Sequence, residues 1–126
     1  LELEMLIVAV YRISLKLYLP CRYSFEANRF LSSTSEGRSL NRYHDRQRVK
    51  TKENNFKELT EAKQRGAEII IEDAGFFARN TLVANNSDYL IAFTFGRGSI
   101  PSSRGTLDTW KKFNGVKKIH ITLLNK

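Results

Sequence analysis

Apolar residues recur along the chain with two periods, and segments of the two kinds alternate. Residues 2–12 and 54–65 place apolar side chains three and four positions apart, which predicts amphipathic helices. Residues 15–19 (LKLYL) alternate until Pro20 and predict a strand. Residues 67–72 (AEIIIE) are a short β-branched run typical of a buried strand.

The same alternation continues in the second half of the chain. Residues 75–86 and 106–113 predict helices, and residues 89–95 (YLIAFTF) and 118–124 (KIHITLL) predict strands. Helices and strands that alternate with short connections predict an α/β fold, with a mainly parallel sheet covered by helices on both faces.

The start of the chain and residues 22–53 depart from this regular pattern. A chain of 126 residues is expected to form one domain, residues 1–126. Because the first predicted helix has no strand before it, we expect an N-terminally incomplete α/β domain. Residues 22–53 hold many charges and few apolar anchors, which predicts an irregular basic insert.

Positive charge is concentrated in two zones of this basic chain, which has a net charge of +8. Residues 22–52 and 97–126 are basic, whereas residues 53–96 are acidic. The basic residues of the first zone recur at every second position: Arg42, His44, Arg46, Arg48, Lys50 and Lys52. Such a segment is either an arm that binds phosphate or nucleic acid, or a solvated insert or surface helix.

Several classes of protein are not indicated by the sequence. No apolar run approaches the roughly 20 residues that cross a membrane. The single cysteine, Cys21, leaves no intramolecular disulfide and no metal cluster. We therefore expect a cytoplasmic protein with neither a membrane partner nor a metal, and the sequence predicts no cofactor.

The loop between residues 95 and 106 carries the clearest indication of chemistry. It follows a predicted strand, contains Gly96 and Gly98, and leads through Arg104 and Gly105 into a helix that begins near Thr106. A strand, a glycine-containing loop and a helix start together present free N–H groups to a phosphate. The structural alternative is a turn and a helix cap.

Other candidates lie near the same predicted sheet edge. Arg79 is one turn into the helix that begins near Gly75, where it suits a phosphate or carboxylate, pairs with Asp73, or extends into solvent. Asp108 and Thr109 lie in the first turns of the helix after Gly105. Asp108 is either a ligand or catalytic carboxylate or a helix-start residue. His120 is expected to pack in or beside the sheet.

Taken together, these segments resemble the SLOG superfamily. The resemblance covers about residues 75–123: Arg79-Asn80, the strand segment Ser87-Asp88-Tyr89-Leu90-Ile91-Ala92-Phe93, and Gly105-Thr106-Leu107-Asp108-Thr109. It implies a Rossmann-like three-layer domain that binds nucleotides or nucleotide-derived ligands. Relative to the family pattern, Asp108 replaces a glutamate, Arg104 replaces a glycine, and the first strand with its glycine-rich loop is missing.

The resemblance implies a nucleotide sensor or ligand-binding module as the leading function. The ligand-binding residues would be Gly96, Gly98, Arg104, Gly105, Thr106, Thr109 and Asp73. One alternative is a phosphoribohydrolase that cleaves the N-glycosidic bond of nucleoside 5′-monophosphates, with Arg79 and Asp108 as its catalytic residues. A second alternative is nucleic-acid binding through the basic zones. Homo-oligomers also occur in the family.

Overall fold

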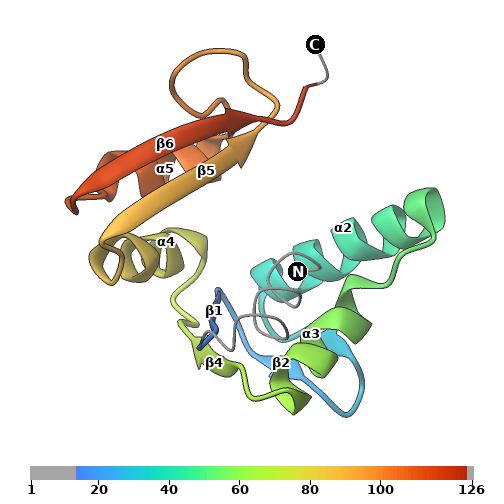
Figure 1. Cartoon of the computed structure of the whole chain (residues 1–126). Coiled ribbons are helices and arrows are strands. Elements are labelled where there is room, and N and C mark those ends of the chain that lie inside the picture. Colours follow the sequence, from blue (N-terminus) through green and yellow to red (C-terminus); the bar gives the residue numbers. More distant parts are fainter. Residues whose placement is uncertain (1–13, 125–126) are drawn as a thin grey trace. The chain divides into compact units, whose positions relative to one another are not determined.

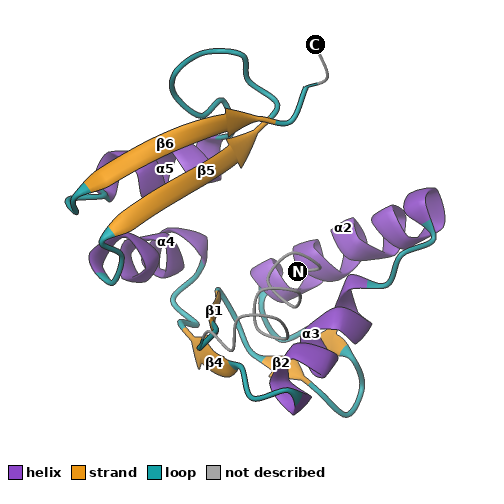
Figure 2. Ribbon diagram, in the orientation of Figure 1, coloured by secondary structure: helices purple, strands orange, loops and turns teal. Residues whose placement is uncertain are grey.

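The computed structural model describes residues 14–124, and the helix expected at residues 2–12 lies outside them. The chain divides into two compact units, one ending at Asp73 and the other beginning at Ala74 (Figure 1). Each unit contains helices and one pair of parallel strands (Figure 2). The expectation of a single domain stays a prediction.

The first unit contains a short parallel pair of strands. Strand β1 (Lys16–Leu19) pairs with β4 (Glu68–Ile71), with Lys16 opposite Glu68 and Leu19 opposite Ile71. Both strands were predicted from the sequence, and both are confirmed. Helix α3 (Asn55–Gln64) precedes β4 and begins at Asn54, whose side chain accepts a hydrogen bond from the Lys57 amide.

Residues 22–53 are more regular than the predicted insert. Strands β2 (Tyr23–Ser24) and β3 (Arg29–Phe30) form a short antiparallel pair, and Ser35–Thr51 form helix α2. The prediction of an irregular segment is wrong here, and the surface-helix alternative describes most of it. The basic residues therefore spread around a helix instead of sharing one extended face.

Helix α2 is fixed to β3 by a polar residue. Asn41 is buried, and its amide accepts from the Phe30 N–H at 3.0 Å and donates to the Phe30 carbonyl at 2.9 Å. Gly37, one turn earlier, is also buried, and a Cβ atom there would overlap the Leu31 carbonyl oxygen. Because these buried positions are not apolar, a search for hydrophobic periodicity cannot detect the inner face of α2.

The core of the first unit is small and largely aromatic. Phe56 and Leu59 of α3 pack with residues that precede α2, and the buried cluster consists of Cys21, Tyr23, Phe30, Phe56 and Leu59. The Tyr23 and Phe30 rings meet edge to face with centroids 5.0 Å apart. The Tyr23 hydroxyl donates to the Phe56 carbonyl, so the one polar group in this cluster of rings has a partner.

The second unit follows the predicted order of elements. Helix α4 (Phe76–Asn85), strand β5 (Tyr89–Thr94), helix α5 (Arg104–Lys112) and strand β6 (Lys117–Thr122) succeed one another. Strands β5 and β6 are parallel along their whole length, with Tyr89 opposite Lys117 and Thr94 opposite Thr122. Helix α5 packs against both α4 and β5.

The two faces of the β5–β6 pair differ. Ala92 and Thr94 are 4% exposed, and α5 lies along one side of the two strands (Figure 1). The alternate positions keep substantial exposed area on large apolar side chains: Tyr89, Ile91, Phe93, Ile119 and Ile121. The apolar run at 89–95 therefore predicts the strand correctly, although only alternate residues of β5 are buried.

The chain has a mixed α/β fold with parallel strands, as the alternation predicts. The hydrogen bonds within residues 14–124 define three two-stranded sheets, and the three-layer arrangement stays a prediction. In the part of the chain that the structure describes, no helix combines the length and apolar character needed to cross a membrane.

We predict that Asn41→Ala lowers the free energy of unfolding of the first unit by about 1–3 kcal/mol, because it leaves two buried backbone groups of Phe30 without partners. Urea unfolding followed by far-UV circular dichroism measures this change. Arg46→Ala, at an exposed position of the same helix, is the control and should change the midpoint little. Equal stabilities of the two variants would contradict the role of Asn41.

Candidate functional site

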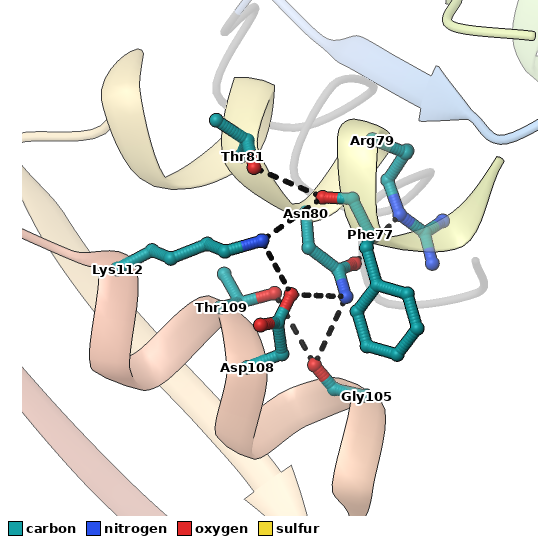
Figure 3. A network of polar contacts seen from close by, with 8 residues as sticks. All are labelled: Phe77, Arg79, Asn80, Thr81, Gly105, Asp108, Thr109 and Lys112. Atoms are coloured by element: carbon teal, nitrogen blue, oxygen red, sulfur yellow. Dashed lines mark hydrogen bonds and ion pairs between the residues drawn. The ribbon is translucent and has the colours of Figure 1, made fainter. Parts of the chain in front are cut away.

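The second unit brings together the main residues that the sequence singled out. Arg79 lies on α4, and Gly105, Thr106, Asp108 and Thr109 lie on α5. Figure 3 shows the facing sides of these helices, with the side chains of α4 reaching toward the first turns of α5. Arg79 and Asp108 do not bond to each other in this network, because a third residue stands between them.

That third residue is Asn80, which is 4% exposed. Its amide nitrogen lies 3.2 Å from both the Gly105 carbonyl and the Asp108 carboxylate, and its oxygen accepts from Arg79 Nε at 3.0 Å (Figure 3). The sequence analysis assigned no chemistry to Asn80. The available signal was an asparagine four residues from Phe76 and from Ala84, on the buried side of a largely apolar helix.

Asp108 is held as a carboxylate by its neighbours. Lys112 Nζ lies 2.9 Å from Asp108 Oδ2, one turn further along α5, and Asn80 donates to the same oxygen. The hydrogen bond from Lys112, helped by that from Asn80, holds the pKa of Asp108 below its usual value. At neutral pH this group therefore has no proton to donate, and its charge connects the two helices.

The N-terminus of α5 has the features of an anion site. Ser103 caps the helix by accepting from the Thr106 N–H at 3.5 Å. The N–H groups of Arg104 and Gly105 come first in the helix and have no partner among residues 14–124. Within the same range the Thr106 hydroxyl also makes no hydrogen bond. These three donors and the positive end of the helix dipole lie at one exposed turn.

Cations and an aromatic ring border this turn. The exposed ring of Phe77 on α4 lies 5.8 Å from the Arg104 guanidinium and 5.8 Å from Lys112 Nζ. Lys112 Nζ also donates to the Phe77 carbonyl at 3.2 Å. The ring therefore offers a flat apolar surface beside two positive charges.

The remaining predicted residues have other places. Gly96 and Gly98 lie in the loop between β5 and α5, where the Gly96 N–H donates to Thr94. The Thr109 hydroxyl donates back to the Gly105 carbonyl at 3.5 Å. Asp73 belongs to the first unit and accepts from Arg22 Nε at 3.1 Å.

The described residues offer no metal chemistry that could be assigned. Among residues 14–124, no group of three histidine, cysteine, aspartate or glutamate side chains is placed to hold a metal ion. Cys21 is a buried free thiol in the core of the first unit. His44 is half-buried beside Phe56, and burial lowers its pKa.

Comparisons with known proteins give one relative and no family. The chain is 34% identical over 110 residues to a protein of Acanthamoeba polyphaga mimivirus named "Uncharacterized protein R261". The aligned part covers 86% of this chain and 57% of that relative. No family model matches the chain, and no solved structure matches it.

We predict that Asp108 stabilises the second unit at neutral pH and ceases to do so in acid. Because its pKa is lowered on folding, the stabilisation is present above the ordinary pKa of 3.8 and is lost as the pH falls through the folded value. Asp108→Asn should therefore be less stable than the unsubstituted chain at pH 7, and the difference should shrink toward pH 3. Fluorescence of Trp110, the only tryptophan, follows this unit.

The control for this titration is Asp88→Asn, since Asp88 is exposed and precedes β5. A stability difference for Asp108→Asn that stays constant from pH 7 to pH 3 would show that the carboxylate charge does not hold the helices together.

Proposed function

We propose that the second unit binds a nucleotide or nucleotide-derived ligand, with the phosphate at the start of α5. The observation that carries this proposal is Gly105. It occupies the second position of the helix, and a Cβ atom added there would have no atom within 4 Å. Neither packing nor a left-handed backbone therefore requires a glycine at this position.

A glycine without a structural reason suggests a reason outside the chain. Glycine in a helix costs up to about 1 kcal/mol relative to alanine, so its presence at an open helix start needs an explanation. A phosphate that approaches the backbone closely supplies one, because a Cβ atom would stand in its path. The unpaired N–H groups of Arg104 and Gly105 would then donate to the phosphate oxygens.

The side chains around this turn match the parts of a nucleotide. Arg104 supplies a positive charge on the first residue of α5, and the Thr106 hydroxyl is a further donor. Phe77 supplies an exposed aromatic face on which a base could stack. The parallel strands and their order along the chain agree with the Rossmann-like, three-layer SLOG domain that we propose for the complete fold.

We favour binding over hydrolysis because of the partners of Asp108. Its carboxylate is already bonded to Lys112 and Asn80, and it has no proton to give at neutral pH. Arg79, the other catalytic candidate, donates to Asn80. Both residues therefore contribute to a contact between α4 and α5, which a sensor needs as much as an enzyme does.

We predict that Gly105→Ala abolishes nucleotide binding without destabilising the protein. The added methyl group enters open space and raises helix propensity, so the free energy of unfolding should stay equal or rise by up to about 1 kcal/mol. Isothermal titration calorimetry with a panel of nucleoside 5′-monophosphates, beginning with AMP, measures the affinity. Lys111→Ala, an exposed substitution on the same helix, is the control and should bind nearly normally.

Unchanged affinity in Gly105→Ala would place the ligand elsewhere. Absence of binding by the unsubstituted chain to every monophosphate, diphosphate and triphosphate in the panel would remove the proposal. Chromatography of the same mixtures tests the alternative, since release of free base that stops in Asp108→Asn would identify a phosphoribohydrolase.

A second candidate function, nucleic-acid binding, is favoured by the surface of α2. Arg38, Arg42 and Arg46 are exposed and four residues apart, so they follow one another along one side of the helix. Cations in a row at this spacing suit contacts to successive phosphates.

We predict that a 20-nucleotide DNA or RNA strand binds more weakly as salt rises if this row is used. Each lost phosphate contact reduces the slope of log affinity against log salt by about 0.7–0.9. The double variant Arg42→Gln, Arg46→Gln should therefore lower the slope by about 1.4–1.8. Lys57→Gln and Lys63→Gln on α3 are the matched control. Fluorescence anisotropy measures both, and salt-independent or undetectable binding would exclude this function.

A further inference from the structure

The loop between β5 and α5 is closed by a cluster of polar residues that the proposed ligand contacts do not include. Its centre is Thr94, the last residue of β5, which is 4% exposed. Thr94 Oγ1 accepts from the Gly96 N–H at 3.3 Å and the Ser102 N–H at 3.2 Å, so it joins the two ends of the loop. His120 of β6 lies beside it, with Nε2 2.6 Å from the same oxygen.

The contacts of His120 determine its tautomer. Nδ1 lies 2.8 Å from the Gly98 carbonyl oxygen, which only accepts hydrogen bonds, so Nδ1 must carry a proton. Thr94 Oγ1 already receives two backbone N–H groups and has two acceptor positions, so its own proton points to Nε2. Nε2 therefore accepts and is unprotonated, and His120 is a neutral imidazole with its proton on Nδ1.

The loop is also tightly packed where these bonds meet. A Cβ atom at Gly96 would lie 2.6 Å from Ser102 Cβ, so the two ends of the loop touch and leave no space for a side chain. Ser102 is followed by Ser103, the cap of α5. The direction in which the chain enters α5 is therefore fixed by the same contacts that close the loop.

We propose that His120 is the positioning residue for the anion site at the start of α5. Through Thr94 at one ring nitrogen and Gly98 at the other, it holds residues 96–102 closed and so orients the N–H groups of Arg104 and Gly105. Its effect on a ligand rests on the proposed nucleotide function, whereas its tautomer and its hold on the loop do not.

The tautomer is tested first, on the unsubstituted chain without ligand. The sequence has two histidines, so a long-range ¹⁵N–¹H spectrum of the imidazole groups shows two spin systems, and the one lost in His120→Asn is His120. We expect the pattern of a ring protonated at Nδ1, which is the less common tautomer of free histidine. A ring protonated at Nε2, or one in rapid exchange between tautomers, would overturn the proposal.

Amide hydrogen exchange then tests the hold on the loop. Phenylalanine at position 120 keeps a ring but has neither a donor for Gly98 nor an acceptor for Thr94. His120→Phe should therefore speed the exchange of the Gly96 and Ser102 amides by about tenfold or more, as expected for the loss of one or two hydrogen bonds. His120→Asn keeps a donor near the Nδ1 position and should show a smaller change, and Ile119→Ala on the opposite face of β6 is the control.

Affinity for AMP separates the two proposals. If the unsubstituted chain binds AMP, His120→Phe should weaken the affinity by about tenfold, and His120→Asn should recover part of it. Equal affinity in His120→Phe would overturn the positioning role and leave the site at Gly105 intact. If no chain binds AMP, the nucleotide function fails for this ligand, and the tautomer and the exchange rates still decide the role of His120.

Discussion

The contact between α4 and α5 depends on one buried amide. Asn80 lies between the helices, donates to the Gly105 carbonyl and the Asp108 carboxylate, and accepts from Arg79. A buried amide is costly unless it is hydrogen-bonded, so the helices are stable together only where these partners meet it. That requirement fixes the first turns of α5 against α4. The position of Gly105 relative to Phe77 and Arg79 follows from it.

The same device recurs at two other places in the chain. Asn41 occupies both backbone groups of Phe30, and Thr94 receives the backbone N–H groups of Gly96 and Ser102. Each is a buried polar side chain that bonds to main-chain atoms of another segment. Apolar burial is not directional, whereas a hydrogen bond specifies distance and angle. With few fully buried apolar residues, this chain uses polar contacts to define how its segments meet.

These contacts also separate the proposed ligand groups from the structural ones. Asp108, Lys112 and Asn80 satisfy one another across the helices, whereas the first amides of α5 and the Thr106 hydroxyl have no partner in residues 14–124. An anion at this turn would meet donors that cost little to reorganise, because they already point outward from a capped helix. The proposed function therefore depends on groups that the fold presents but does not use.

The sequence by itself determined the order and type of the elements from residue 54 onward, because helix and strand periods and the caps at Asn54 and Ser103 are local properties. It also indicated the glycine turn at the start of α5. Only the tertiary structure revealed that residues 35–51 form a helix, because the inner face of α2 is marked by Gly37 and Asn41 instead of apolar residues. Likewise, Asn80, Thr94 and His120 gained their roles from partners 8 to 28 positions away. A periodic pattern reports burial along one segment, but the partner of a buried polar group is chosen by the packing of two segments.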